Sequence, residues 1–188
     1  MAGGPDAVLK ESKSSMEKAL EALQRNFARV RTGRASLSLL DGIRVDYYGT
    51  PTPLNQVGSL SIPEPRLIAI QPWDKSMIPA IERAILQSQM DLNPNNDGNL
   101  VRIPIPKLTE ERRKELVKVA KGMTEEAKVA VRGVRRDANA QLDALQREDS
   151  LPEDAARRAK DEVQKVTDQY VQKADELLKK KEAEILEV

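Results

Sequence analysis

The sequence predicts an α+β protein: an elongated three-helix bundle into which a small β/α/β domain is inserted. Three long stretches carry apolar residues at helical spacing, over about residues 5–31, 109–147 and from 150 onward. Between the first two, residues 35–104 are richer in proline and glycine and favour short strands. Because one amphipathic helix cannot bury its apolar stripe alone, the helix before the insert is expected to pack against the two that follow it.

Each long helix has a stripe and start or stop residues. The first helix runs from Pro5 to Arg31, and Gly33 follows as a stop. Thr109 is the expected N-cap of the second, which at about 1.5 Å per residue is about 55–60 Å long. Ser150 and Glu153 have the spacing of a capping box for the third. The stripes are Met16, Leu20, Leu23, Phe27 and Val30; Leu116, Val119, Met123, Ala127, Ala130, Val134, Ala138, Leu142 and Leu145; and Ala159, Val163, Val166, Tyr170, Ala174, Leu177 and Ile185.

The insert is expected to contain three short strands and one helix. The strands are predicted at Ile43–Tyr48, Leu67–Gln71 and Val101–Ile103, and the helix at Lys75–Gln89. The YYGTPTP run, residues 47–53, is predicted to be a turn-rich connection. Trp73, the only tryptophan, is expected to lie in the core or at the start of the helix rather than to stack on a ligand.

The predicted domains are therefore discontinuous. Residues 1–31 and 107–188 form the bundle, and residues 32–106 form the insert. Two connections, at 32–35 and 104–108, act as a hinge, with Thr32, Gly33, Pro104 and Pro106 as the hinge residues. A two-helix coiled coil that needs a partner is the alternative.

The composition excludes several kinds of active site. There is no histidine and no cysteine, which excludes Ser-His and Cys-His nucleophiles and ordinary zinc sites. No P-loop motif is present. Asn93, Asn95, Asp97 and Gly98 imitate the start of a calcium loop, but Pro104 stands where a bidentate glutamate is required. We therefore expect no catalytic residues, no metal and no cofactor. With no signal core and no membrane-spanning run, a cytoplasmic location is expected.

One face of the second helix is basic. Lys121, Lys128, Arg132, Arg135 and Arg136 fall within an arc of about 100° at roughly 100° per residue, with Met123, Ala127, Ala130 and Val134 on the other side. Arg31 and Arg34 add charge at the end of the first helix. A solvated helix face is the ordinary interpretation of such a pattern. Arginine forks suit phosphate oxygens, and the stripe lacks aromatic residues, so the pattern favours contact with the backbone of a structured RNA.

Several runs resemble the bacterial ribosome recycling factor family. They are VRTGRAS (30–36), LLDGI (39–43), YYGTPTPL (47–54), LNPN (92–95), LTEERR (108–113), VAVRGVRRDAN (129–139) and DEVQKVTD (161–168). The ordered set covers nearly the whole chain and is far more specific than any one run. Gly133 departs from the family, which more often has a polar side chain there.

The resemblance implies an L-shaped, non-enzymatic protein with a hinge between bundle and insert. It implies binding to the large ribosomal subunit after termination. With elongation factor G and GTP, the family splits the ribosome into subunits, with a functional link to initiation factor three. Arg31, Arg34, Arg132, Arg135 and Arg136 are then expected to face ribosomal RNA, and a monomer is expected.

Two other classes of function stay open on the residues alone. A chaperone-like helical protein would bind unfolded clients and show no salt-dependent ribosome binding. A general RNA-binding module would bind many RNAs with similar affinity. Neither class gives the insert and its hinge an obvious role.

Overall fold

The computed structural model describes residues 4–148 and 150–187, and within it the chain divides into two compact units. The first unit holds the residues up to Arg31 and those from Glu110 onward, and the second is Thr32–Thr109. The second boundary lies three residues beyond the predicted one at 107. The predicted α+β organisation, a helical bundle interrupted by a small sheet domain, is confirmed.

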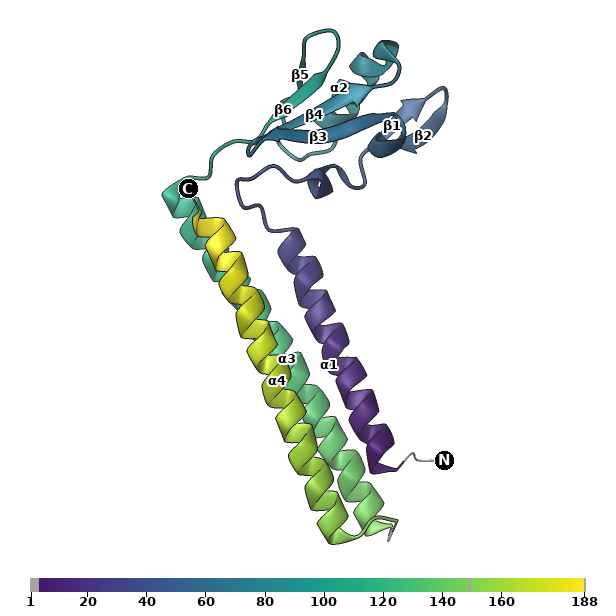
Figure 1. Cartoon of the computed structure of the whole chain (residues 1–188), viewed down its shortest axis with the longest axis vertical. Helices are drawn as coiled ribbons and strands as arrows, with labels where there is room; N and C mark the ends of the chain where they lie inside the picture. Colours follow the sequence, from purple (N-terminus) through teal and green to yellow (C-terminus); the bar gives the residue numbers. More distant parts are fainter. Residues whose placement is uncertain (1–3, 149, 188) are drawn as a thin grey trace. The chain divides into compact units, whose positions relative to one another are not determined.

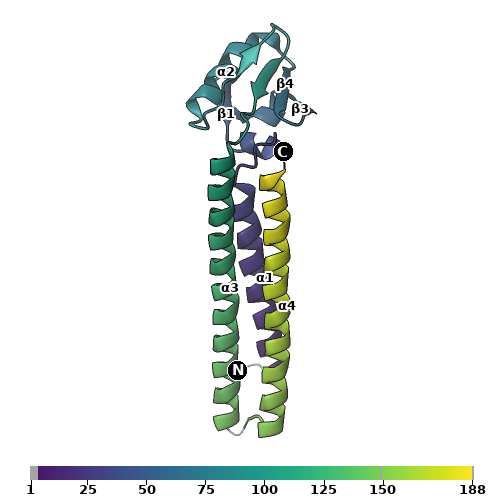
Figure 2. The same cartoon turned by 90° about the vertical axis from the view of Figure 1, so that its left-hand side faces the viewer.

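The first unit is a bundle of three helices (Figures 1 and 2), α1 (Pro5–Ala28), α3 (Glu110–Arg147) and α4 (Glu153–Leu186). α3 and α4 lie side by side and antiparallel, and α1 packs against both. All five residues of the predicted first stripe are buried, as are Val163, Val166, Tyr170, Ala174 and Ile185 of the third. At one end of the bundle, Val8 of α1 packs in a cluster with Leu142 of α3 and Val163 of α4.

The apolar stripe of α3 differs from the prediction in its middle. Val119 is 46% exposed and Ala130 is exposed, whereas Ala120 and Val131 are fully buried. Thr124 is buried as well, and its hydroxyl donates to the carbonyl of Ala120 at 2.9 Å. A polar threonine on the buried face conceals the true phase of the stripe in the sequence. Because it includes Val131, the buried stripe reaches the edge of the predicted basic face and does not lie opposite that face.

The start of α4 also differs from the prediction. The N-cap position is Pro152, with no side-chain cap. Ser150 is not the cap: its hydroxyl donates to the carbonyl of Glu148 at 3.3 Å. Proline fits because its fixed φ suits a helix start and it has no N–H that needs an acceptor.

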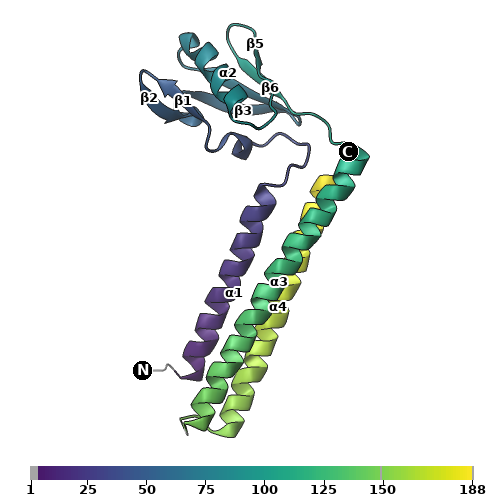
Figure 3. The same ribbon diagram turned by 180° about the vertical axis from the view of Figure 1, so that it is seen from behind.

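The second unit holds two antiparallel sheets and one α-helix (Figure 3). β1 and β2 form a hairpin, and the four-stranded sheet has the order β3-β4-β6-β5. Three 3-10 turns precede β1, β3 and α2. The bounds are η1 (Leu37–Leu40), β1 (Arg44–Tyr47), β2 (Thr50–Pro53), η2 (Leu54–Gln56), β3 (Gly58–Glu64), β4 (Leu67–Pro72), η3 (Lys75–Met77), α2 (Ile78–Gln87), β5 (Asn95–Asn96) and β6 (Val101–Pro104).

The core of this unit lies between the sheets and α2. Ile68 and Ile70 of β4 are fully buried together with Ile81 and Ile85 of α2 and Ile103 of β6. Gly58 of β3 is required by a close approach, since a Cβ there would lie 2.5 Å from the carbonyl oxygen of Gln71. The three predicted strands and the helix are present, although η3 forms the first turn of the predicted helix.

Three features of the second unit differ from the prediction. Residues 50–53, predicted as part of a connection, form strand β2, which pairs only with β1 and therefore tolerates its two prolines. The sequence also gave no indication of β3 or β5. Of the two places predicted for Trp73, the core is wrong and the start of the helix is correct: its side chain is 72% exposed, just before η3. Among the described residues, no helix combines the length and apolar character needed to cross a bilayer.

Candidate nucleic-acid interface

The five basic residues predicted on α3 fall into two groups. Arg132 and Arg136 are exposed, and no hydrogen bond or ion pair is found for either within the described part of the chain. Lys121, Lys128 and Arg135 reach instead to side chains of α4. The structure therefore separates the predicted basic face into an outer pair of arginines and an inner row along the α3–α4 seam.

Lys128 is the most enclosed member of the inner row. Its side chain is 13% exposed, with Nζ 2.5 Å from Oδ1 of Asp175 on α4 and 3.4 Å from Oε1 of Glu125. The hydrogen bond to Asp175 is the main cause that raises the pKa of Lys128 above 10.5. The ammonium group thus remains charged at neutral pH and already has two carboxylate partners. A phosphate would have to compete with them.

The other two members of the inner row follow the same pattern. Nζ of Lys121 lies 3.6 Å from Oε1 of Glu182, and Arg135 donates to Oε1 of Gln164 at 3.0 Å. Gln164 in turn donates to Oδ1 of Asp168 at 2.8 Å.

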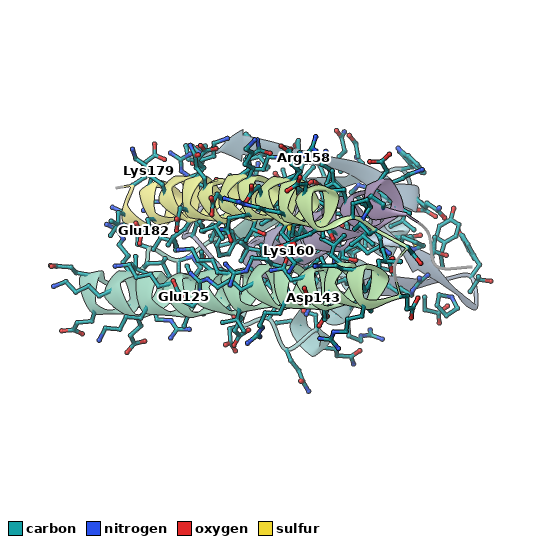
Figure 4. All side chains as sticks on the ribbon, turned by 90° about the horizontal axis from the view of Figure 1, so that it is seen from below. Glu125, Asp143, Arg158, Lys160, Lys179 and Glu182 are labelled. Atoms are coloured by element: carbon teal, nitrogen blue, oxygen red, sulfur yellow. The ribbon has the colours of Figure 1, made fainter. Side chains whose placement is uncertain are left out.

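One further pair at the seam has the opposite polarity. Asp143 of α3 accepts from Lys160 of α4 (Figure 4). The labelled residues of this pair come from facing sides of the two helices.

The spacing of the inner row follows from antiparallel packing. Lys121, Lys128 and Arg135 are seven residues apart, which is two helical turns and returns to one side of the helix. The step of seven from Lys121 to Lys128 is matched by a step of seven back along α4, from Glu182 to Asp175, and the partner of Arg135 lies further back, at Gln164. The inner row therefore follows the antiparallel register of α3 against α4.

The outer pair flanks a surface with little side-chain bulk. Val129 is 56% exposed, and Gly133 follows one turn later between the two arginines. A Cβ added at Gly133 would meet only Nη2 of Arg136, at 4.0 Å. The two guanidinium groups have no competing carboxylate in the described structure, which is the arrangement that a phosphate backbone can use.

Arg31 and Arg34 lie in different units. Arg31 is the last residue of the first segment of the bundle, and Arg34 belongs to the second unit. Both side chains are exposed, and both also interact within the protein. The structure therefore brings Arg132 and Arg136 together on one helix, while Arg34 is placed on the other unit.

The structure attaches parts of the two predicted hinge segments to the sheet of the second unit. The prediction of Pro104 as a hinge residue is wrong, because Pro104 lies in β6, pairs with Leu67 and belongs to the sheet. The backbone N–H of Ile105 donates to Arg66 and that of Ala35 to Pro65, each at 2.8 Å. Both connections are thus attached to the same turn between β3 and β4.

Thr32, Gly33 and Pro106 remain as hinge candidates beyond these attachment points. Gly33 has φ +75°, a backbone conformation that favours glycine. A Cβ there would lie 3.1 Å from Cγ of Leu108, so the two connections touch each other at this residue.

Sequence reasoning missed the acidic partners on α4. The available indication was that Asp168, Asp175 and Glu182 are also spaced by seven residues and carry charges opposite to those of the basic row on α3. Within the described residues there is no cluster of three acidic side chains that could hold a metal ion. What the surface can do chemically is bind anions through the outer arginines.

Known proteins of one family match nearly the whole chain. The family model described as "Ribosome recycling factor" matches residues 23–186. The ribosome-recycling factor of Oleidesulfovibrio alaskensis is 56% identical over 97% of this chain and 100% of its own length. That of Carboxydothermus hydrogenoformans is 51% identical over 96% of this chain and 98% of its own.

Solved structures give the same result. A solution structure of the ribosome recycling factor matches with a TM-score of 0.79 and 42% identity, covering 100% of both chains. A second match, with a TM-score of 0.63 and 46% identity, covers 97% of this chain and 98% of the other. It comes from models of the T. thermophilus ribosome recycling factor and the E. coli elongation factor G bound to the E. coli post-termination complex.

These relatives define the class of protein: a non-enzymatic factor of protein synthesis that binds the ribosome. The chain belongs to the ribosome recycling factor family.

Proposed function

We propose that this protein binds the large ribosomal subunit after termination and, with elongation factor G and GTP, splits the ribosome into its subunits. It would do so as a monomer in the cytoplasm, where initiation factor three then acts on the released small subunit. The relative described with elongation factor G on a post-termination complex supports this assignment.

The observation that carries the proposal is the outer pair on α3. Arg132 and Arg136 are exposed, have no partner among the described residues and flank Gly133. Planar guanidinium groups bind phosphate oxygens in a bidentate manner. An exposed surface with little bulk allows an RNA backbone to come close, and the absence of aromatic side chains argues against base stacking.

The inner row has a different proposed role. Lys121, Lys128 and Arg135 hold α3 and α4 in register, so that the outer arginines keep their positions. Arg135 is half-buried against Gln164, and its removal is expected to disturb the seam as well as any RNA contact.

The hinge completes the proposed mechanism. The bundle would stay attached through phosphate contacts while elongation factor G displaces the second unit. Movement would be absorbed at Thr32, Gly33 and Pro106, because Ala35 and Ile105 are held to the sheet.

Light scattering of post-termination ribosomes tests the proposal. A fall in scattering that requires this protein, elongation factor G and GTP together is the expected result. Binding to the large subunit is measured in parallel by sedimentation over a range of salt concentrations. If the protein neither binds the large subunit nor lowers scattering, the proposal is wrong and the arginines are an ordinary solvated face.

A further inference from the structure

A hollow of about 440 Å³ lies within the second unit, between the β1–β2 hairpin and α2, which packs against β1 (Figure 3). Its volume falls in the range of about 300–1,000 Å³ that is usual for ligand sites. The residues that line it are Arg44 and Asp46 of β1, Pro51 of β2, and Ala80, Arg83, Ala84 and Gln87 of α2. None of these residues belongs to the α3 surface or to the hinge.

The geometry of strand and helix directs the lining side chains to one place. In β1, Val45 is buried in the core, so its neighbours Arg44 and Asp46 turn away from the core. On α2 the lining residues follow one another at intervals of three, one and three, which places them on one side of the helix. The hollow is therefore built by regular elements and not by a loop.

Arg44 and Arg83 supply two guanidinium groups to this hollow. Both side chains are exposed, and no hydrogen bond or ion pair is found for either within the described residues. Gln87, one turn after Arg83, adds a side-chain amide that can donate to an oxygen. Guanidinium forks bind phosphate oxygens in a bidentate manner. Two such forks and an amide donor around one hollow therefore suit a phosphate group.

Asp46 is the one acidic residue among those that line the hollow. Its Oδ1 accepts from the N–H of Gly49 at 2.8 Å, which ties the carboxylate to the turn between β1 and β2. The lining residues carry two positive charges against this negative one, so the hollow favours an anion. Asp46 weakens that preference without reversing it.

The lining favours a nucleic-acid backbone over an acidic peptide. Its apolar part consists of Pro51 and two alanines, so it offers no pocket with large apolar walls for the anchor side chain of a peptide. Backbone phosphates need charged donors at fixed positions and little apolar surface. No aromatic ring lines the hollow, so there is no platform on which a base could stack.

We propose that Arg44, Arg83 and Gln87 bind a phosphate group of an RNA backbone, which gives the second unit an RNA contact of its own. The choice of ribosomal RNA as the source of that phosphate rests on the proposed function. The site is distinct from the outer arginines, because those belong to α3 of the bundle. Loss of the site should therefore weaken ribosome binding while the outer pair remains intact.

The local test follows the side-chain NMR resonances of Arg44, Arg83 and Gln87 in the full chain. A short A-form RNA hairpin and inorganic phosphate are titrated separately at matched ionic strength. The hairpin is expected to shift these resonances at concentrations about tenfold or more below those of phosphate, because its neighbouring phosphates add to the attraction. Equal concentrations would show a general anion site and overturn the RNA assignment, and no shift with either probe overturns the site.

Variants of the full chain test the same site on intact post-termination ribosomes, without elongation factor G. Arg83→Ala should weaken ribosome binding about tenfold, as for the loss of a charge-assisted hydrogen bond. Arg66→Ala, which removes an exposed arginine of the same unit outside the hollow, should bind as the wild type does. Both side chains are exposed, so both variants are expected to fold, which circular dichroism checks.

A second pair of variants predicts the opposite sign. Asp46→Asn keeps an oxygen that can accept from Gly49 but removes the negative charge, so it should strengthen ribosome binding about threefold. Asp41→Asn changes the net charge equally at an exposed position outside the hollow and should leave the affinity unchanged.

The proposal is wrong if Arg83→Ala binds ribosomes as the wild type does. It is also wrong if each control matches its partner variant, because total charge then governs binding. A loss by Arg83→Ala that appears only when elongation factor G is titrated would show that the hollow meets a protein, which overturns the RNA contact. Failure of the wild type to bind ribosomes is distinct: it overturns the proposed function, and the NMR titration with the RNA hairpin then decides the site alone.

Discussion

Lys128 of α3 and Asp175 of α4 form an ion pair in which Nζ and Oδ1 are 2.5 Å apart and the lysine side chain is only 13% exposed. Removing Asp175 would leave the enclosed ammonium group with Glu125 alone, at 3.4 Å. Asp175→Ala should therefore lower the free energy of unfolding by about 1–3 kcal/mol. Urea denaturation followed by circular dichroism measures this.

An exposed pair on the same helix serves as the control. Lys114 and Glu110 lie 2.9 Å apart with side chains that are 68% and 82% exposed. Lys114→Ala should change the free energy of unfolding by less than about 0.5 kcal/mol. Similar small losses in both variants would show that the α3–α4 seam depends on apolar packing alone.

The pH dependence of the Lys128 pair follows from its raised pKa. A raised folded-state pKa means that the stabilisation is fully present below about pH 10.5 and is lost as the pH rises through the folded value. The pair therefore contributes throughout the neutral range. The stabilisation by the ion pair is lost only at alkaline pH.

The helices were predictable from the sequence because their apolar spacing is regular. Met16, Leu20, Leu23 and Phe27 are buried as expected. The phase of the apolar stripe on α3 was not predictable. The helix packs against two neighbours and buries Thr124, whose hydroxyl donates to the carbonyl of Ala120. A polar residue that forms its hydrogen bond within the helix is invisible to a search for apolar spacing.

The small unit was less predictable for a related reason. β2 contains two prolines and pairs on one side only, so its sequence resembles a turn. Trp73 is exposed, although tryptophan usually packs in a core. At the candidate site the basic residues were identified, but their division into an outer pair and an inner row depends on the partners that α4 supplies. Those contacts join residues far apart in the chain.

Alanine substitutions at three glycines are expected to change stability in opposite directions. Gly122 and Gly133 lie within α3, where a Cβ meets no atom within 4 Å or only Arg136 at 4.0 Å. Gly122→Ala and Gly133→Ala should each stabilise the protein by about 1 kcal/mol, since alanine favours a helix. Gly58→Ala should destabilise it, because its Cβ would clash with the carbonyl of Gln71 at 2.5 Å. Thermal unfolding of the three variants tests the signs, and a shift of the same sign in all three would contradict the geometry.

The turn before β6 should titrate at low pH. Asp97 accepts from the N–H groups of Leu100 and Asn99 and from Arg102, and these bonds lower its pKa to about 2. Because this pKa lies below the ordinary 3.8, the carboxylate stabilises the turn above pH 3.8 and loses this effect as the pH falls through about 2. An NMR titration of the Asp97 carboxyl carbon should give a midpoint near that value, and an ordinary midpoint would show that the turn is not held by these bonds.

Substitutions at Gly33 are expected to impair ribosome splitting more than they impair binding to the large subunit. Its φ of +75° costs about 1–2 kcal/mol for a residue with a Cβ, and proline cannot adopt it. Gly33→Pro should therefore impair splitting more than binding to the large subunit, because the outer arginines are untouched. Gly33→Ala should have a smaller effect of the same kind, through the 3.1 Å approach to Leu108.

Leu108→Ala distinguishes the two causes at Gly33. Combined with Gly33→Ala it removes the approach to the leucine but leaves the backbone conformation unchanged. Partial recovery of splitting in the double variant is expected if the contact matters. Equal losses of binding and splitting in Gly33→Pro, or no loss of either, would count against a hinge at this residue.

Removal of the outer arginines is expected to weaken large-subunit binding and to make that binding less dependent on salt. Arg132→Ala combined with Arg136→Ala should weaken large-subunit binding at physiological salt. It should also reduce the slope of log affinity against log salt by about 2, roughly one for each phosphate contact. Both side chains are exposed, so the free energy of unfolding should barely change. Arg157→Ala, an exposed arginine of α4, is the matched control and should leave affinity and slope as in the wild type. An equal loss in the control would mean that net charge alone drives binding, and an unchanged slope in the double variant would place the RNA contact on another surface.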